Sequence, residues 1–444
     1  MSGRLGPRLV VAGVSSGVGK TTVATGLLAA LTGRGVRAAG AKVGPDFIDP
    51  SYHALACGRP PRNLDPWLCG TDAIAPLAAR AAPDADVLVV EGVMGLFDGA
   101  TDNTPSSTAD VAALLDAPVL LVVDASAMSA SVAAMVRGYR DHDPRVRVAG
   151  VVLNQVGSAG HEALLREALE PLGVPVVGCL HRDDAFLWRD RHLGLVPVAE
   201  HPDAVRHSLD VLAERVTESF DLDAVLAIAS SAPERTCDDV ALPPFVGRCR
   251  IAIAAGPAFT FAYRDNLDAF EAAGAELVPF DPLVDASLPD GVDGLLVGGG
   301  FPEVYGESLA ANTPLLDDVR ARVTGGLPTW AECGGLLWLA DQLDGHAMAG
   351  VLPATAQLGT RLTLGYRVAE TTAPSPIGPA GTMLRGHEFH YSTCTPGGDA
   401  LRLTSRFVDR HDGFASPTLL ATYLHWHAGG DPTPAESFVR ACLS

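Results

Sequence analysis

The chain is poor in positive charge and lacks the patterns of disulfide-rich and nucleic-acid-binding proteins. Lys and Arg total 32 against 52 Asp and Glu, so the formal net charge is −20. A field of that sign repels nucleic acid and anionic membrane surfaces, and we expect neither as a partner. The eight cysteines are scattered and include no C-x-x-C pair. Reduced thiols are therefore favoured over a disulfide framework.

Long apolar runs are also missing. The longest, such as APVLLVVDA at 117–125, fall far short of the roughly 20 residues that span a bilayer. The N-terminal residues show no basic-then-apolar leader. These absences predict a cytoplasmic protein without a membrane segment. With 444 residues, of which 48% are hydrophobic and 19% charged, the chain is long enough for two or three domains of about 150 residues each, or for two larger ones.

Apolar runs alternate with helical patterns along the first half of the chain. Runs such as 8–13, 85–92 and 117–126 are continuous rather than alternating. Continuous Val/Leu runs indicate strands that are buried on both faces of a parallel sheet. Residues 20–33 read as a helix that follows the first run closely. The pattern predicts an α/β fold whose N-terminal domain, 1–235, is doubly wound and mostly parallel.

A second α/β series begins after a break in this rhythm. Residues 230–249 gain Pro, Ser and charge, so we assign a linker to 236–248. Apolar runs resume at 250–256. The later segments RLTLGYRVAET and LRGHEFHYS alternate in polarity and look antiparallel. We therefore predict a second α/β domain over 249–444.

The stretch GVSSGVGKTT at 13–22 lies between the first predicted strand and the first predicted helix. Glycines let backbone N–H groups close around phosphate oxygens at a helix N-terminus. Lys20 would reach the β- and γ-phosphates of ATP, and the Thr21 hydroxyl would ligate Mg²⁺. Asn154, at a later strand end, is assigned to the adenine edge, with a turn-forming role as the alternative. The nucleotide-binding residues predicted are Gly17, Gly19, Lys20, Thr21, Thr22 and Asn154.

Carboxylates follow two of the predicted strands. Asp46 and Asp49 come after the run at 37–44, and Glu91 ends another run, in the position of a Walker-B-type acid, with Asp98 close behind. The carboxyl ends of parallel strands face the crevice in which ligands bind. We predict that these acids serve a phosphoryl-transfer site, and that Asp46 and Glu91 ligate the metal together with Thr21. Surface or helix-capping roles are the alternative.

One cysteine of the second domain has a setting typical of a nucleophile. AECGG at 331–335 approximates the G-x-C-x-G turn between a strand and a helix, with Ala331 in place of the first glycine. Such a thiol needs a base, and ATYLHWHAGG supplies His425 and His427 at period two. The glycines of VGGGFPE at 297–303 could form an oxyanion hole. Cys333 is therefore the predicted nucleophile; an apolar filler is the alternative for it, and a zinc site for the histidines.

Several of these motifs resemble known families. GGGFPE, AECGG and YLHWH are similar to the cobyric-type class I glutamine amidotransferase domain. SSGVGKTT, KVGPDFIDPSYH, NLDPW, VVEGVMGLFDG and RGHEFHYS resemble the a,c-diamide synthases of corrin biosynthesis. The phosphate loop departs from the strict motif at Val14 and looks like the variant of the dethiobiotin synthetase branch. Ser15 stands where partitioning ATPases of that superclass carry a signature lysine, which argues against such an ATPase.

The resemblance implies a ligase that converts the a- and c-acetate side chains of cobyrinic or hydrogenobyrinic acid to amides, with ATP, Mg²⁺ and glutamine. It makes Cys333 the glutaminase nucleophile and His425 its base, with His427 as the fallback. It also assigns Asp46, Asp49, Glu91 and Asp98 to the synthetase site. The usual triad carboxylate, two positions after the histidine, is replaced here by His427 itself. The resemblance therefore leaves open which group orients His425.

Other functions are compatible with the same motifs. A related amidotransferase could act on another tetrapyrrole, as nickel sirohydrochlorin a,c-diamide synthase or cobyric acid synthase does, although GPDFIDPSYH favours the a,c-enzyme. A nucleotide-switch P-loop protein with a non-catalytic amidotransferase domain is a further alternative. A corrinoid with many carboxylates would need local cations, for which Lys42, Arg62 and the segment 180–192 are candidates, with solvated surface as the alternative. A homodimer is left open.

Overall fold

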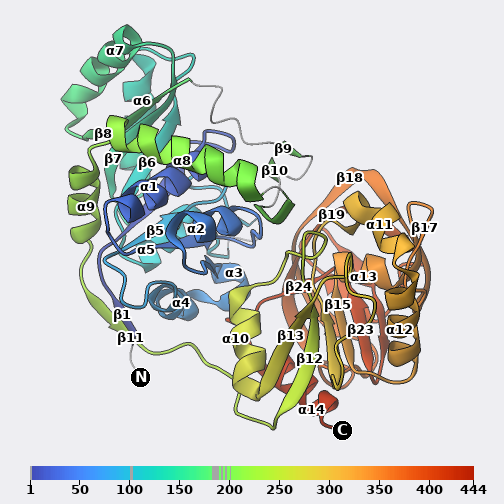
Figure 1. Ribbon diagram of the computed structural model, residues 1–444. Coiled ribbons are helices and arrows are strands. Elements are labelled where there is room, and N and C mark those ends of the chain that lie inside the picture. Colours follow the sequence, from blue (N-terminus) through green and yellow to red (C-terminus); the bar gives the residue numbers. More distant parts are fainter. Residues whose placement is uncertain (1–2, 101–103, 183–189, 192–193, 196–197, 201) are drawn as a thin grey trace. The chain divides into compact units, whose positions relative to one another are not determined.

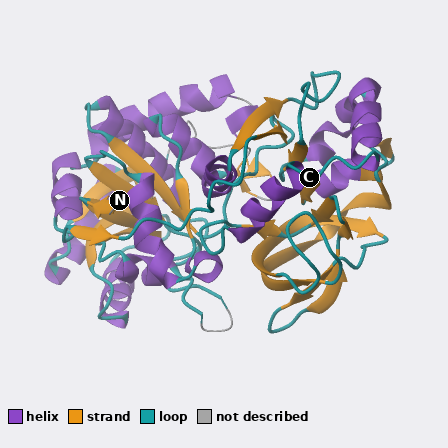
Figure 2. Cartoon of the chain, turned by 90° about the horizontal axis from the view of Figure 1, so that it is seen from below, coloured by secondary structure: helices purple, strands orange, loops and turns teal. Residues whose placement is uncertain are grey.

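The chain forms two compact units, each with its own sheets and cores (Figure 1). The computed structural model describes residues 3–100, 104–182, 190–191, 194–195, 198–200 and 202–444. The units are Met1–Val240 and Ala241–Ser444. Their division falls within 236–248, the segment to which the sequence assigned a linker. In both units, helices flank the strands (Figure 2).

The N-terminal unit is built on a seven-stranded sheet in the order β4-β3-β5-β2-β6-β7-β8. The strands are β4 (Arg62–Leu64), β3 (Ala38–Val43), β5 (Val87–Glu91), β2 (Arg8–Gly13), β6 (Val119–Asp124), β7 (Val148–Val156) and β8 (Val176–His181). All pairings along this order are parallel. Every residue of β2, β3 and β5 is buried, as expected for strands covered on both faces. The doubly wound, mostly parallel fold predicted from the sequence is confirmed.

Helices connect these strands and complete the core. They are α1 (Lys20–Gly33), α2 (Asp49–Cys57), α3 (Pro66–Cys69), α4 (Ile74–Ala81), α5 (Thr108–Leu114), α6 (Ser131–His142), α7 (Ala159–Leu169), α8 (Pro202–Ser219) and α9 (Leu222–Ser230). Apolar residues of α1, α8 and α9 share one core with the sheet. The short strands β1 (Gly3–Leu5) and β11 (Arg235–Cys237) pair antiparallel, as do β9 (Asp190–Arg191) and β10 (Gly194–Leu195).

The strand order places the edge at which a ligand would bind. From β2 the chain crosses through α1 to β3, and from β5 it crosses through α5 to β6 on the other side of β2. The order therefore reverses around β2 and β5, and ligands of open α/β sheets bind outside the carboxyl ends of strands at such a point. Helix α1 begins at Lys20, so the predicted phosphate loop lies at this edge.

The C-terminal unit contains a six-stranded sheet in the order β13-β12-β14-β15-β23-β22, in which only the β22–β23 pairing is antiparallel. The strands are β13 (Ala275–Phe280), β12 (Cys249–Ala254), β14 (Gly294–Val297), β15 (Thr329–Glu332), β23 (Leu419–Thr422) and β22 (Phe414–Ser416). Its helices are α10 (Arg264–Ala273), α11 (Gly306–Ala311), α12 (Thr313–Thr324), α13 (Gly334–Leu339) and α14 (Thr433–Cys442).

A second sheet of this unit carries the antiparallel segments expected from the sequence. Its strands are β16 (Ala340–Leu343), β17 (His346–Ala347), β18 (Leu352–Thr371), β19 (Met383–Thr395), β20 (Leu401–Thr404), β21 (Asp409–Asp412) and β24 (His425–Trp426). Strands β18 and β19 form its long antiparallel pair. The α/β prediction for this unit is confirmed.

The segment 421–430, interpreted from the sequence as the end of one strand, is divided between the two sheets. Strand β23 ends at Thr422, and β24 pairs with β19 so that His425 lies opposite His387. Side chains replace the ladder at the break: Asp412 accepts hydrogen bonds from the Thr422 hydroxyl and the Tyr423 amide. The period-two pattern suggested that the two histidines share one strand face. They do not, because His427 lies beyond the end of β24.

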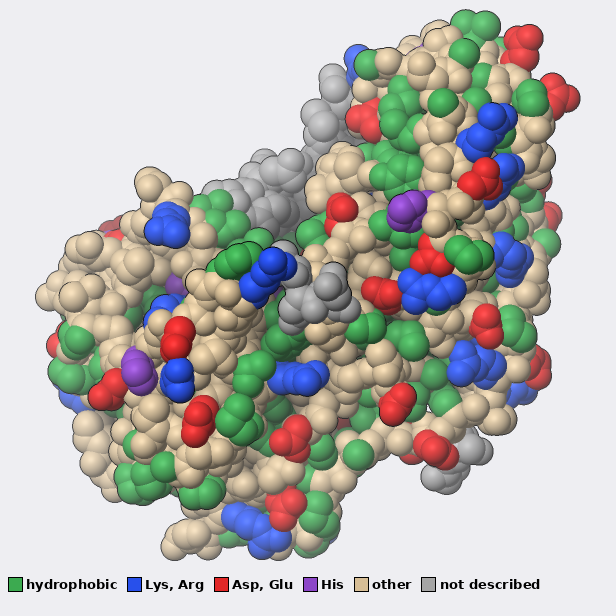
Figure 3. All heavy atoms as spheres, turned by 180° about the vertical axis from the view of Figure 1, so that it is seen from behind, with side chains coloured by type: hydrophobic (Ala, Val, Ile, Leu, Met, Phe, Trp, Pro, Cys, Tyr) green, Lys and Arg blue, Asp and Glu red, His purple; other side chains and the backbone are tan. Residues whose placement is uncertain are grey.

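None of the helices in the described ranges is both long and apolar enough to span a bilayer. On the face drawn in Figure 3, basic side chains are interspersed with acidic ones.

Gly26 lies inside α1, and a Cβ there would come 2.7 Å from Val216 and 3.1 Å from Leu212 of α8. Gly26→Ala would gain about 1 kcal/mol in helix propensity, but overpacking costs about 1–3 kcal/mol. We expect a lower Tm for the N-terminal unit, by about 2–4 °C for each net kcal/mol lost. Gly33→Ala, in the last position of the same helix, is the matched control, since no described atom lies within 4 Å of its new Cβ. A rise in Tm for Gly26→Ala would contradict this packing.

Candidate functional site

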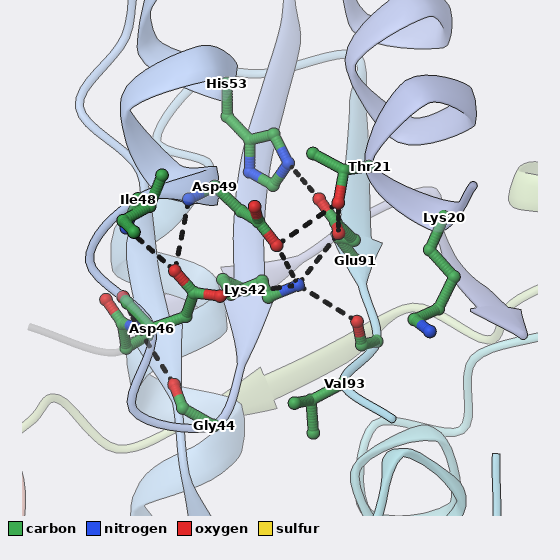
Figure 4. Close-up of polar contacts among 12 residues, drawn as sticks. Lys20, Thr21, Lys42, Gly44, Asp46, Ile48, Asp49, His53, Glu91 and Val93 are labelled. Carbon is green, nitrogen blue, oxygen red and sulfur yellow. Dashed lines mark hydrogen bonds and ion pairs between the residues drawn. The ribbon is translucent and has the colours of Figure 1, made fainter. Parts of the chain in front are cut away.

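The only two lysines in the sequence, Lys20 and Lys42, both belong to the carboxyl edge of the N-terminal sheet. Lys42 of β3 lies opposite Glu91 of β5 in register. Its Nζ donates hydrogen bonds to Asp49 Oδ2 at 2.6 Å, Glu91 Oε1 at 2.8 Å and Gly92 O at 3.1 Å (Figure 4). The Lys42 side chain is 3% exposed. A cation is thus buried among carboxylates.

Burial and charge act in opposite directions on this cluster. Burial lowers the pKa of Lys42, but the carboxylates of Asp49, Glu91 and Asp46 outweigh it and raise that pKa above its ordinary value. For Glu91, burial raises the pKa, but Lys42 and then His53 outweigh it and lower that pKa. Burial and then Asp46 raise the pKa of Asp49 well above its ordinary value, against the effect of Lys42. Lys42 and Glu91 therefore form the ionised centre of the cluster.

Thr21 and His53 complete this group. The Thr21 hydroxyl lies 2.7 Å from Glu91 Oε1 and 3.2 Å from Asp49 Oδ2. The fully buried His53 has Nε2 at 2.6 Å from the other oxygen of Glu91. Sequence reasoning missed His53, although it follows Asp49 by one helical turn in α2. Three oxygens, from Thr21, Asp49 and Glu91, thus converge beside Lys42, and this all-oxygen donor set suits Mg²⁺.

The other two predicted acids have structural roles at the same edge. One oxygen of Asp46 accepts hydrogen bonds from the amides of Ile48 and Asp49 at the start of α2. Its other oxygen lies 4.0 Å from Lys42 Nζ. Asp98 accepts a hydrogen bond from the Gly95 amide at 2.9 Å. Asp46 thus contacts the cluster at longer range, whereas Asp98 holds its own turn.

The phosphate loop has the backbone conformation that its glycines permit. Gly17 and Gly19 have φ of 78° and 91°, in the left-handed region. The ammonium of Lys20 donates to Ser15 O at 3.0 Å, and Thr22 lies with it in the first turn of α1. Asn154 donates to Val18 O at 2.9 Å. A Cβ on Gly19 would come 2.1 Å from the Asn154 amide nitrogen, so Asn154 braces the loop.

Not all of the candidate cations are available to bind a polycarboxylate substrate. Lys42 is buried and already paired with carboxylates. Arg62 is buried in β4, with 9% exposure. Of the segment 180–192, residues 183–189 and 192 lie outside the described residues. The contacts of Lys42 thus contradict its assignment as a free substrate-binding cation, because its charge is already compensated.

The predicted nucleophile lies in a strained turn of the C-terminal unit. Cys333 stands between β15 and α13 with φ 48° and ψ −99°, a conformation that a non-glycine residue rarely adopts. A Cβ on Gly335 would come 2.3 Å from Val297 O, and one on Gly334 would come 3.0 Å from Gly300 N. The turn therefore requires glycines after the cysteine, because β14 and the loop after it pass directly against it.

The ring of His425 lies across the same glycine loop. A Cβ on Gly299 would come 2.6 Å from His425 Cε1 and 3.3 Å from its Nε2. Gly299 in turn lies next to Gly334, 3.3 Å from the position of a Cβ there. On its other side, His425 Nδ1 is 3.4 Å from Glu332 Oε2. Sequence reasoning missed Glu332, although it directly precedes Cys333.

The predicted oxyanion hole is smaller than the three glycines suggested. The Gly299 amide donates to Phe261 O at 3.2 Å, and Gly299 O accepts from the Phe261 amide at 3.0 Å. This bridge engages the N–H of Gly299. The amide of Gly300, which borders the turn at Cys333 and Gly334, is then the candidate oxyanion-hole donor in this loop.

Burial and the surrounding acids keep the thiol of Cys333 protonated in the ligand-free protein. Cys333 is 5% exposed. Burial, and then the nearby carboxylate of Glu303, raise the pKa of this thiol above its ordinary value. Since the thiolate is the nucleophile, the site needs a base.

His427 occupies a different setting from His425. Its ring stacks at a tilt on Tyr263, with ring centroids 4.5 Å apart. Its Nε2 is 4.0 Å from Asp265 Oδ2, and its Nδ1 accepts a hydrogen bond from the Gly429 amide. These contacts support His425, rather than the fallback His427, as the partner of Cys333.

The motif RGHEFHYS forms a buried polar network on β19. Glu388 is fully buried and pairs with Arg367 at 2.7 Å and with Arg410. The ring of His390 stacks on Tyr423, with centroids 3.7 Å apart. Glu388 is also one of the charges that raise the pKa of Cys333, after burial and Glu303. The network thus belongs to the surroundings of the thiol, which its sequence pattern did not reveal.

Comparison with known proteins matches both units. The family model of the CobQ/CobB/MinD/ParA nucleotide binding domain covers residues 9–195. That of the CobB/CobQ-like glutamine amidotransferase domain covers residues 250–433.

Curated relatives match over nearly the full length. Hydrogenobyrinate a,c-diamide synthase of Streptomyces coelicolor is 47% identical, over 99% of this chain and 98% of the relative. The protein of that name from Thermobifida fusca is 45% identical, over 98% of this chain and 96% of the relative. Cobyrinate a,c-diamide synthase of a Synechococcus species is 43% identical, over 98% of both chains. With its nucleotide-binding and glutamine amidotransferase domains, this chain belongs to the family of the hydrogenobyrinate and cobyrinate a,c-diamide synthases.

Proposed function

We propose that this protein is a cytoplasmic ligase that uses ATP and glutamine to amidate the a- and c-acetate carboxylates of hydrogenobyrinic or cobyrinic acid. The names of the relatives support the substrate and the reaction. The observation that carries the proposal is the presence of two chemically different sites in one chain. One has Lys42 buried among carboxylates next to a phosphate loop that carries Lys20, and the other has a thiol in a strained turn beside a histidine.

The N-terminal site would activate the carboxylate. A carboxylate oxygen of the corrinoid attacks the γ-phosphorus of ATP, the bond to the β-phosphate oxygen breaks, and an acyl phosphate and ADP result. Lys20 and the loop amides would hold the phosphates. Thr21, Asp49 and Glu91 have the oxygens that would hold Mg²⁺, with Asp46 at longer range. When bound, Mg²⁺ neutralises charge on the phosphates.

The C-terminal site would supply the nitrogen. The sulfur of Cys333 bonds to the amide carbon of glutamine while His425 takes the thiol proton. The carbon–nitrogen bond then breaks, the proton passes to the leaving nitrogen, and ammonia and a thioester result. Water hydrolyses the thioester to glutamate. Ammonia then attacks the acyl phosphate, and phosphate leaves as the amide forms.

Cys333→Ala tests whether the thiol serves only ammonia production. We expect glutamine-driven amidation to fall at least about 1,000-fold, because catalytic nucleophiles supply rate factors of that order or more. Amidation with high ammonium should stay within about twofold, since the carboxylate is activated in the other unit. Corrinoid products are counted by mass spectrometry. Cys57→Ser, in α2 of the N-terminal unit, is the control variant. Loss of both nitrogen sources in Cys333→Ala would contradict the two-site proposal.

Glu91→Gln tests the buried cluster. We expect amidation to fall at least about 100-fold with either glutamine or ammonium, because Lys42 keeps only Asp49 as a close carboxylate and removing one partner of a buried ion pair costs about 3–5 kcal/mol. Basal glutamate release by the other unit should persist, and a retained cooperative unfolding transition shows that the N-terminal unit is folded. The exposed Glu167→Gln on α7 serves as the control. Undiminished amidation in Glu91→Gln would remove this cluster from the reaction.

The two lysines should titrate very differently. Burial, and then the charge of Lys42, lower the pKa of Lys20 to about 8. Lys20 is therefore charged below about pH 8 and neutral above it in the ligand-free protein, so affinity for ATP should fall as pH rises through that value. Protein labelled with isotopic lysine gives two side-chain NMR signals, which Lys20→Arg assigns. The Lys20 signal should titrate near pH 8 and that of Lys42 above the ordinary value of about 10.4; a Lys20 midpoint above 10 would contradict this.

A further inference from the structure

The structure holds a carboxylate where the sequence showed none to orient the base of the glutaminase site. We propose that Glu332 is the positioning residue for His425: its carboxylate pairs with the Nδ1 side of the ring and thereby directs Nε2 toward the thiol of Cys333. This inference rests on the proposed glutaminase chemistry of Cys333. The carboxylate comes from the residue before the nucleophile rather than from the position two residues after the histidine.

The contacts of Glu332 reach across two sheets. Its Oε2 is 3.4 Å from His425 Nδ1, and its Oε1 accepts from the Trp426 amide at 3.4 Å. One carboxylate thus spans the imidazole and the next backbone amide of β24. The opposite edge of the ring, Cε1 and Nε2, faces Gly299 beside the turn at Cys333. The two ring nitrogens therefore have different neighbours, and the carboxylate selects the tautomer with hydrogen on Nδ1.

Backbone pairing brings these residues together. Strands β15 and β23 are parallel, and Glu332 lies opposite Thr422, three residues before His425. The Cys333 amide continues this ladder by donating to Thr422 O at 2.7 Å. Cys333 directly follows the end of β15 in the strained turn, so one strand end carries both the carboxylate and the thiol. The nearby His427 instead faces Asp265.

The surroundings strengthen the contact. The side chain of His425 is 2% exposed and that of Glu332 is 14% exposed. Glu332 lines a pocket of about 50 Å³ that is walled by aromatic side chains such as Phe261, Trp330 and Trp426. Charges interact more strongly in such a low-dielectric setting than in water. His387, the partner of His425 in register on β19, is another titratable group that interacts with it. Burial, and then His425, lower the pKa of His387 to about 3, so it is neutral near pH 7.

Two modes of action for Glu332 predict opposite signs. The carboxylates of Glu303, Glu332 and Glu388 all act on Cys333 in the direction that disfavours its thiolate. If Glu332 acted only in this direct way, its neutralisation would make the thiol more reactive. If it acts through His425, its carboxylate stabilises the imidazolium that forms when the thiol gives up its proton. Neutralisation would then make the thiol less reactive.

The test compares Glu332→Gln with Glu332→Asp and with the exposed control Glu307→Gln of α11. In Glu332→Gln, kcat for glutamate release should fall at least about 100-fold, since neutralising the orienting carboxylate of a catalytic triad costs about 10⁴-fold. The KM for glutamine should stay within about threefold, because Glu332 acts through His425. The kcat of Glu332→Asp should be at least about tenfold higher than that of Glu332→Gln. Alkylation of Cys333 by iodoacetamide at pH 7, followed on its own peptide by mass spectrometry, should slow in Glu332→Gln and stay unchanged in Glu307→Gln.

Unchanged kcat or faster alkylation of Cys333 in Glu332→Gln would overturn the proposal. Equal losses of kcat in Glu332→Gln and Glu332→Asp would also overturn it, because activity would then not depend on a carboxylate at this position. Ammonium-driven amidation should be unchanged in all three variants, since it needs only the N-terminal site, and an unchanged unfolding transition of the C-terminal unit shows that each variant is folded. Failure of the proposed function is a separate outcome: the unaltered protein would then release no glutamate or would form no amide from ammonium.

Discussion

The ammonium of Lys42 is buried among carboxylates, and the N-terminal site depends on that charge being compensated. Leaving either member of a buried ion pair alone costs several kcal/mol, so Lys42 and Glu91 constrain each other. Their pairing follows from the register of β3 and β5. The two oxygens of Glu91 then place the neighbouring side chains: Thr21 shares Oε1 with Lys42, and His53 contacts Oε2. A site whose charges are positioned by strand register in this way would reduce the reorganisation that the proposed phosphoryl transfer requires.

The C-terminal site depends instead on close backbone approach. Cys333 is held at positive φ, and the surrounding structure must impose that strain. Gly299 and Gly335 permit it, because any side chain there would collide with His425 or with the carbonyl of Val297. The same close packing buries the thiol and raises its pKa. A thiol that acts as a nucleophile here would need a base, and the proposed base, His425, would have to be oriented toward it.

Much of both sites could be predicted because their signals are local. The start of α1 at Lys20, the buried run ending at Glu91 and the turn at Cys333 each depend on neighbours within a few residues. Long-range partners could not be read in this way. The sequence assigned Asn154 to adenine or to a turn, and no local signal showed that its side chain donates to Val18 O in the phosphate loop. The sequence also suggested Lys42 as a substrate-binding cation, whereas Glu91 of the paired strand β5 compensates its charge.

The sequence by itself determined the two α/β units, the phosphate loop and, through its motifs, the family, and it singled out Cys333 as the proposed nucleophile. These features are encoded by apolar periodicity and by short runs of residues whose spacing along the chain is also their spacing in space. Only the tertiary structure decided which histidine faces the thiol turn and which carboxylate faces that histidine. The reason is that β23 ends at Thr422 and the chain changes sheets before His425. Contacts made across that change, such as Glu332 with His425, depend on strand pairing rather than on separation along the chain.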